Sequence, residues 1–344
     1  MADAEDLTER ERRILEAVIE TYIATAEPAG SHRVARRSSL GMSPASIRNT
    51  MSDLEEKGYL YHPHTSAGRI PTDRAYRLYV DTLADRALPD PQACEHLEMA
   101  LSSGPSTDDL LARAAQMLGI LTQELGVAVA PALEEIVLDR VDLAPVASDR
   151  LLLVLSLRSG NIRSIYVRLR GALTPIDVDE VQRTLNERLA GLTLREIRAT
   201  FAERLRDARS QPDGSELLDI ILAEGEGLFD VAEPHDPVVL GNQSVLMEQP
   251  EFASQDQMRS LLTLTDRRGL LRRALADRKR EGITVSIGGE HREPGLATFT
   301  LVTSTYRRGG ATGVIGVLGP TRMAYDKIVG LVEHAGRLIE GLSQ

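Results

Sequence analysis

The chain of 344 residues has one cysteine, no tryptophan and only four phenylalanines. The single cysteine, Cys94, excludes an intramolecular disulfide and a cluster of thiolate metal ligands. The longest apolar runs, such as residues 151–157, are too short to cross a bilayer, which takes about 20 consecutive apolar residues. The acidic, polar start MADAEDLTERE is unlike a secretory signal. We therefore expect a cytoplasmic protein that does not bind a membrane.

A recognisable catalytic set is also missing. The spacing of the seven histidines gives no Cys–His or Ser–His–Asp arrangement, and no paired carboxylates stand out. The glycine-rich residues 309–316 lack the Lys-Ser or Lys-Thr that completes a phosphate loop, so we interpret them as hairpin and sheet glycines. His62 and His64 could share one face of a strand, but no third metal ligand lies near them in sequence. We expect no enzyme activity, no cofactor and no metal.

The charge of the chain is unevenly distributed. The formal net charge is −11, which by itself is unusual for a protein that binds nucleic acid. Residues 31–80, however, contain eight basic and four acidic residues, a net charge of +4. The rest of the chain, with 32 basic and 47 acidic residues, carries −15. Any affinity for nucleic acid should therefore be confined to residues 31–80, because the acidic remainder would repel DNA.

The sequence predicts a short helix within this basic region, with residues typical of a helix start at one end and of a helix stop at the other. Ser43 can cap its start by accepting a hydrogen bond from a backbone N–H of the first turn. Pro44 suits the first helical position, where its missing N–H costs nothing. Gly58 ends the helix after Lys57. At 100° per residue, the apolar side chains fall on one face, which should be buried. They are Ile47, Met51 and Leu54.

The opposite face of this helix begins with polar side chains that can hydrogen-bond base edges and phosphates. A shorter helix and a turn containing Gly41 precede it, which together form a helix-turn-helix pattern. Residues 59–62 read as a strand, and residues 66–69 read as the tip of a hairpin, or wing. A small helical domain with a solvated hairpin is the alternative. The expected DNA-binding residues are Ser43, Ser46, Arg48, Asn49, Ser52, His64, Thr65, Ser66 and Arg69.

The remaining chain alternates between strands and helices. Strands are predicted within residues 135–168 and again within residues 284–318, and a helical block separates them at about residues 171–250. One sheet domain interrupted by an insertion explains this order, and two separate α+β domains are the alternative. A second basic cluster at residues 267–280 reads as a solvated helix face, with a contact surface as its alternative.

Two long motifs lie at opposite ends of the chain. The first runs through residues 43–72 and includes SPASIRN, LEEKGYL and HTSAGRIPT; the second is IGVLGPTRM at residues 315–323, followed by Tyr325. Both resemble the HrcA family, the bacterial heat-inducible transcription repressors. The resemblance covers the whole chain, and the only variation noted is Ile70-Pro71 in place of the usual Val-Pro.

The resemblance implies an α+β multidomain fold with an N-terminal winged helix-turn-helix and a GAF-like α/β domain that carries an inserted helical/β dimerisation domain. It also implies repression of chaperone operons by a homodimer bound to an inverted-repeat operator in double-stranded DNA, assisted by a GroEL-type chaperonin. The alternative is a regulator that senses a ligand in the GAF-like pocket. The expected boundaries are 1–88 for the winged helix, 89–106 for a linker, 107–170 and 251–344 for the GAF-like domain, and 171–250 for the insertion.

Overall fold

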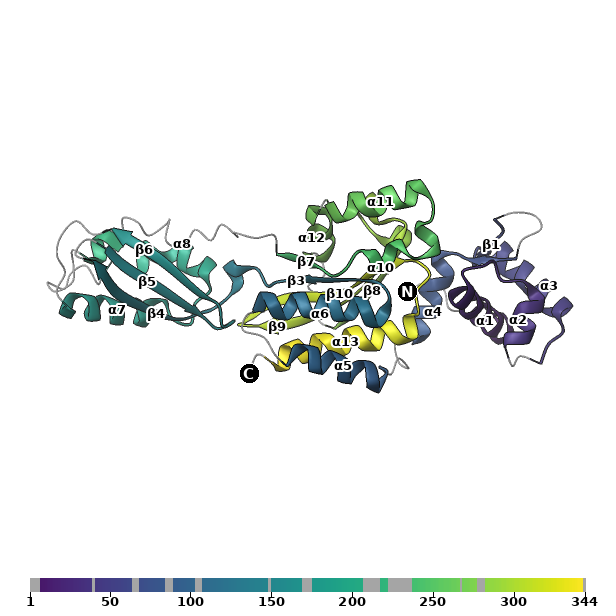
Figure 1. Ribbon diagram of the computed structural model, residues 1–344, viewed down its shortest axis with the longest axis horizontal. Helices are drawn as coiled ribbons and strands as arrows, with labels where there is room; N and C mark the ends of the chain where they lie inside the picture. Colours follow the sequence, from purple (N-terminus) through teal and green to yellow (C-terminus); the bar gives the residue numbers. More distant parts are fainter. Residues whose placement is uncertain are drawn as a thin grey trace.

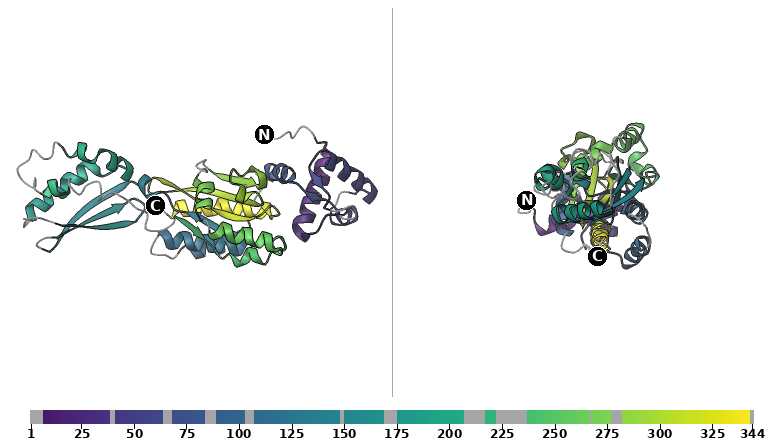
Figure 2. Two further views of the ribbon diagram at one scale, coloured as in Figure 1. Left: turned by 90° about the horizontal axis from the view of Figure 1, so that it is seen from above. Right: turned by 90° about the vertical axis from the view of Figure 1, so that its left-hand side faces the viewer.

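A computed structural model describes residues 7–38, 41–63, 68–83, 89–102, 107–147, 150–168, 175–206, 217–221, 237–266, 268–276 and 282–342. The described elements form three units in a row along an elongated molecule (Figures 1 and 2). The N-terminal unit lies at one end, a unit with a three-stranded sheet lies at the other, and a unit with a five-stranded sheet lies between them.

The N-terminal unit is helical, with a two-stranded antiparallel ladder. Its first helix begins with a capping box, in which the Thr8 hydroxyl and the Glu11 carboxylate each accept a hydrogen bond from the other residue's backbone N–H. Ile14 and Val18 of this helix are fully buried against the other helices. The elements are α1 (Glu9–Thr25), α2 (Ser31–Arg37), α3 (Pro44–Glu56), β1 (Leu60–Tyr61), β2 (Ile70–Pro71) and α4 (Asp73–Leu83).

The central unit is built on an antiparallel sheet with the strand order β7-β3-β10-β9-β8. Gly309 and Gly310 form the tight turn between β9 and β10, and both have positive φ, which explains glycine at these two positions. The interpretation of this stretch as hairpin glycines is therefore confirmed. The strands are β3 (Leu125–Val129), β7 (Val238–Leu240), β8 (Ile283–Ile287), β9 (Phe299–Arg308) and β10 (Ala311–Pro320).

Helices cover both faces of this sheet, because its strands carry apolar side chains on both sides. Along β10, Ile315 and Val317 pack into the core on one face, and Val314 and Leu318 pack into the core on the other. The first face is covered by α6 (Thr107–Thr122) and α13 (Tyr325–Gly341), and α5 (Pro91–Leu101) packs against both of these helices. The second is covered by α10 (Ser244–Met247), α11 (Gln255–Asp266) and α12 (Arg268–Ala276). Short 3₁₀ turns lie at Pro250–Phe252, Gly288–Glu290 and Pro294–Leu296.

The third unit has its own core. A three-stranded antiparallel sheet, with the order β4-β5-β6, buries Leu151, Leu153 and Leu155 against two amphipathic helices. The elements are a 3₁₀ turn (Leu133–Glu135), β4 (Leu138–Ala147), β5 (Arg150–Leu157), β6 (Ile162–Arg168), α7 (Pro175–Leu189) and α8 (Leu194–Arg204). Residues 217–221, which belong to the predicted helical block, are also helical.

This grouping corrects two of the boundaries expected from sequence. The strands at residues 138–168, which we expected in the GAF-like domain, pair with one another and not with the five-stranded sheet. Conversely, β7, which we expected in the insertion, pairs with β3. The chain leaves the central sheet after Val129 and returns at Val238, and these two residues face each other in the ladder. The insertion therefore lies between β3 and β7 and contains both strands and helices.

The expected linker at residues 89–106 is also corrected. Residues 91–101 form α5, which packs against α6 and α13 and buries Leu97 and Leu101 in the core. Hydrophobic burial therefore attaches α5 to the central unit. Among the described residues, no helix is long and apolar enough to span a membrane.

Substitution of Gly126 should destabilise the central unit. A Cβ at this position of β3 would lie 1.7 Å from the carbonyl oxygen of Ala115 in α6, so the helix could not keep its distance from the sheet. Such overpacking costs about 1–3 kcal/mol. We expect Gly126→Ala to lower the unfolding temperature in scanning calorimetry, and we expect no such loss for Gly295→Ala, whose added Cβ would meet only Leu270 at 3.8 Å. Equal unfolding temperatures for the two variants would contradict this explanation.

Candidate nucleic-acid interface

Helix α3 forms as the sequence predicts. The Ser43 hydroxyl accepts a hydrogen bond from the backbone N–H of Ser46 (3.2 Å), and Pro44 occupies the first helical position. Ile47, Met51 and Leu54 are buried, together with Thr50. Gly58 follows the last turn with φ +77°, and Tyr59 donates its N–H to the carbonyl of Leu54. The buried face therefore leaves the opposite face of α3 exposed.

Most of the helical residues expected to contact DNA lie on that exposed side. Ser43, Arg48, Asn49 and Ser52 are exposed. The Arg48 guanidinium has no ion-pair partner among the residues that the structure describes. A free cation and an amide on the first turns of a capped helix are suited to reading base edges or phosphates, and the N-terminus of the helix also favours anions. Ser46 is half-buried and lies beside them.

Two residues of α1 hold the two ends of α3. The Arg10 guanidinium donates to the Ser46 hydroxyl at 2.5 Å, and the Lys57 ammonium lies 2.9 Å from the Glu11 carboxylate. The hydrogen bond from Lys57 lowers the pKa of Glu11 below its usual value. Helices α1 and α3 should therefore move as one body. This link could not be predicted from the sequence, because Arg10 lies 36 residues from Ser46 along the chain.

The ladder after α3 is short. Leu60 pairs with Pro71 and Tyr61 pairs with Ile70. A further bridge between Ala29 and Arg69 ties this ladder to the segment between α1 and α2, with backbone hydrogen bonds of 2.8 and 3.0 Å. Gly68 is required beside this bridge, because a Cβ there would lie 2.5 Å from the Ala29 backbone. The expected DNA-binding residues His64, Thr65 and Ser66 lie outside the described residues.

The structure places Arg69 differently from the sequence expectation. Arg69 lies beside the last strand pair rather than at the hairpin tip, and its side chain is only 14% exposed. Its guanidinium forms an ion pair with Glu55 of α3 at 2.8 Å, and both groups also contact His62. The Arg69 side chain therefore connects the ladder to α3. This contact depends on the three-dimensional path of the hairpin, which the sequence pattern did not specify.

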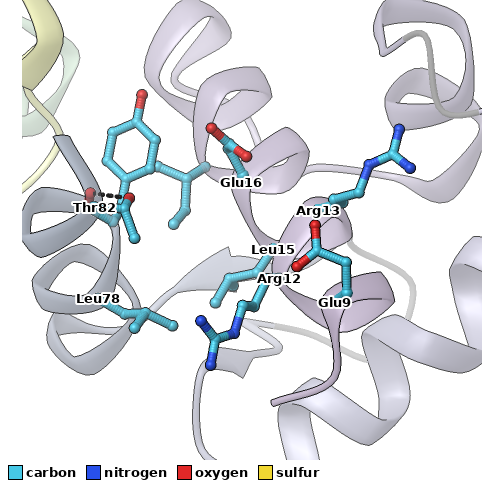
Figure 3. A pocket seen from close by; sticks show the side chains of 9 residues that line it. Glu9, Arg12, Arg13, Leu15, Glu16, Leu78 and Thr82 are labelled. Atoms are coloured by element: carbon cyan, nitrogen blue, oxygen red, sulfur yellow. Dashed lines mark hydrogen bonds between the residues drawn. The ribbon is translucent and has the colours of Figure 1, made fainter. Parts of the chain in front are cut away.

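A pocket of about 220 Å³ lies between α1 and α4. Figure 3 shows Arg12, Arg13, Glu9 and Glu16 around it, with Leu15 and Leu78 on its apolar side. The mixture of two cations and two anions does not select a ligand of one charge. Among the described residues, no group of three or more His, Cys, Asp or Glu side chains is placed to hold a metal ion.

Comparison with known proteins identifies relatives along nearly the whole chain. A family model described as the HrcA protein C-terminal domain matches residues 108–329. The heat-inducible transcription repressor HrcA of Chlorobium phaeobacteroides (strain BS1) is 36% identical over 354 aligned residues, which cover 98% of this chain and 99% of the relative. The repressor of the same name from Chlorobaculum tepidum (strain ATCC 49652 / DSM 12025 / NBRC 103806 / TLS) is also 36% identical, with 98% of each chain covered.

A solved structure is also similar. The crystal structure of a hypothetical protein at 2.2 Å resolution is 26% identical in sequence, has a TM-score of 0.64, and covers 98% of this chain and 100% of its own. The family model matches more than half of the chain, and the relatives are transcription repressors rather than enzymes. The chain therefore belongs to the HrcA family of heat-inducible transcription repressors.

Proposed function

We propose that this repressor binds an inverted-repeat operator upstream of chaperone operons as a homodimer, with α3 as the recognition helix of a winged helix-turn-helix domain. The observation that carries this proposal is the pair Arg48 and Asn49, exposed on the first turns of a helix whose other face is buried. Arginine reads guanine and asparagine reads adenine through bidentate hydrogen bonds in the major groove. Ser43, Ser46 and Ser52 add hydroxyls that suit phosphates or bases.

The unit between β3 and β7 is the proposed dimerisation domain, inserted into a GAF-like domain. One edge of its sheet is covered, because the side chains of Asn186 and Gln182 in α7 bind the backbone N–H groups of Val141 and Leu143 in β4 at 2.8 and 2.7 Å. The opposite edge is β6, which among the described residues pairs with β5 alone. A free edge of this kind favours pairing with a second chain.

The outer face of the same sheet supports a second copy as the partner. Ile162 and Tyr166 of β6 point away from the helices and are each 69% exposed, and Val146 at the end of β4 is 55% exposed. Leu152 and Val154 of β5 lie between these strands and are half-buried. An exposed apolar patch next to a free strand edge is typical of a protein–protein interface. A two-fold axis through such an interface matches the symmetry of an inverted repeat.

Assistance by a GroEL-type chaperonin is the remaining part of the proposal, and the family resemblance supports it. The direct experiment is a footprint on the region upstream of the organism's own chaperonin genes, with and without added chaperonin. We expect protection of two symmetric half-sites, and we expect more protected DNA when chaperonin is present. Protection of a single asymmetric site would contradict the inverted repeat. Protection that does not change with chaperonin would contradict the assistance.

Among the residues that the structure describes, no observation favours the ligand-sensing alternative. The pocket of about 220 Å³ lies between α1 and α4 of the N-terminal unit and not in the five-stranded unit that would be the GAF-like domain (Figure 3). We therefore do not propose that a ligand in a GAF-like pocket sets DNA affinity.

Arg48→Ala and Asn49→Ala should each reduce sequence discrimination by about 1–3 kcal/mol, because each removes a bidentate base contact. The measurement is the ratio of operator binding to random-sequence binding at one salt concentration. Arg13→Ala is the matched control, since Arg13 is an exposed arginine of α1 that lines the pocket facing α4. A variant that keeps the wild-type ratio would show that its residue does not read a base.

Arg69→Ala should weaken operator binding without changing the dependence of affinity on salt. The Arg69 guanidinium is already paired with Glu55, so it does not neutralise a phosphate when DNA binds. Its removal instead breaks the contact between the hairpin and α3. Loss of a phosphate contact would make the slope of log affinity against log salt shallower by about 0.9. Glu55→Gln should have the same effect as Arg69→Ala. A slope that becomes shallower by this amount would place Arg69 on the DNA, as the sequence pattern first indicated.

Tyr166→Asp should convert the dimer into a folded monomer, because it places a charge in the apolar patch next to the free edge of β6. Loss of the linked second reader should lower operator affinity by roughly 10²- to 10⁴-fold. Sedimentation and operator titration measure the two effects. Arg183→Asp is the matched control and should remain dimeric. Arg183 lies on α7, away from the patch on β6, and its side chain is 68% exposed. A dimeric Tyr166→Asp protein with full affinity would place the dimer contact elsewhere.

A further inference from the structure

A half-buried ion pair lies where the N-terminal unit meets the central unit. The Arg322 guanidinium binds the Glu251 carboxylate through two nitrogens, and the Nη2–Oε2 distance is 2.9 Å. Its third nitrogen, Nη1, donates to the backbone carbonyl of Ile23 at 2.8 Å. The Arg322 and Glu251 side chains are 15% and 20% exposed. A fixed three-way fork of this kind requires arginine, because a lysine ammonium lacks the planar donor geometry.

The Ile23 carbonyl belongs to the last turn of α1, where carbonyl groups lack partners within the helix and carry partial negative charge. The last turn of α1 has no basic residue of its own. Arg322, which lies 299 residues further along the chain, supplies the missing cation. The contact therefore satisfies the end of α1 and joins α1 to the central unit in one geometry.

A second anchor acts through α4. The Arg77 guanidinium binds Glu290 and donates to the carbonyl of Val285 in β8 at 2.7 Å. The backbone N–H of Gly289 donates to the Asp73 carboxylate at 3.0 Å. These bonds attach α4 to the central sheet, and Tyr76 of α4 also packs against Tyr325 of α13, with ring centroids 5.8 Å apart. The Arg322 contact lies on α1, so the central unit holds the N-terminal unit at a second helix as well.

The orientation of α1 determines the orientation of α3, because side chains of α1 contact both ends of α3. Arg10 and Glu11 of α1 hold Ser46 and Lys57 at the two ends of α3, as described above. A chain of polar contacts therefore runs from Arg322 through the end of α1 to the start of the recognition helix. These contacts involve Ser46 and Lys57 and leave the side chains of Arg48 and Asn49 exposed.

We propose that Arg322 is a positioning residue that fixes the direction of α3 relative to the central unit and thereby determines which spacing between operator half-sites the dimer accepts. This inference rests on the proposed function, because half-site spacing has meaning only for two copies on an inverted repeat. In such a pair, each recognition helix must reach its half-site at a separation set by the protein. If the direction of α3 is fixed, the dimer binds well at only one separation of the half-sites. If α3 can change direction, the dimer binds at several separations.

The test compares the full-length wild type with Arg322→Gln and Glu251→Gln on operators whose central spacer is lengthened or shortened in steps of one base pair. We expect the wild type to lose roughly 10²-fold in affinity when the half-sites are moved by about five base pairs, half a helical turn. Each variant should bind the natural spacing more weakly and lose less than tenfold over the same series. Binding to one isolated half-site should not change.

Arg322→Lys tests the geometry rather than the charge, and we expect it to restore only part of the spacing preference. Arg273→Gln is the matched control, because Arg273 forms a 2.9 Å pair with Glu293 within the central unit alone. That variant should keep the wild-type spacing profile. If Arg322→Gln and Glu251→Gln also keep it, the proposal fails. If the wild type itself is indifferent to spacing, the proposed reading of an inverted repeat by a dimer fails instead.

A measurement without DNA separates these two cases. Spin labels at Glu56→Cys in α3 and Ser260→Cys in α11, in a Cys94→Ser background, report the distance between the two units. Dilution with an excess of unlabelled protein leaves one labelled chain in each dimer. We expect a narrow distance distribution for the wild type and for Arg273→Gln, and a broad one for Arg322→Gln and Glu251→Gln. A narrow distribution in all four proteins would overturn the positioning role of Arg322.

Discussion

The pairing of β3 with two strands that are far away in sequence is the constraint on which the architecture depends. β3 lies between β7 and β10, so residues 125–129, 238–240 and 311–320 meet in one sheet. The β3–β7 ladder closes the loop that contains the whole three-stranded unit. The β3–β10 ladder brings the end of β10, and with it Arg322, toward the N-terminal unit. The positions of both outer units therefore follow from one strand.

Local features of the fold could be predicted from the sequence because their causes are local. The cap at Ser43, the proline that follows it and the capping box of Thr8 and Glu11 involve residues at most three positions apart. The buried face of α3 follows from helical periodicity, and the β9–β10 turn follows from two adjacent glycines. The exposed side of α3, with Arg48 and Asn49, could be predicted for the same reason.

Features that depend on distant partners could not be predicted in the same way. The strands at residues 138–168 have apolar alternation that suits either sheet, and only packing against α7 and α8 decides between them. The sequence around Arg69 is typical of an exposed turn, but the Arg69 side chain forms an ion pair with Glu55 and lies against α3. Arg322 belongs to a motif noticed for its resemblance to a family, but nothing near it in sequence indicates that its partners are Glu251 and Ile23.

The facing ends of the insertion, Val129 and Val238, also bear on how the chain is made. A ribosome releases residues in order, so β3 emerges long before β10 can pair with it, and this pairing of high contact order is slow to form. The three-stranded unit is built mainly from a continuous segment and has its own core, so it can fold while synthesis continues. The central sheet must then close after the three-stranded unit, which lies between β3 and β7, has been made. Until it closes, Arg322 cannot reach the Ile23 carbonyl, so the contact between α1 and the end of β10 is among the last that a newly made chain can form.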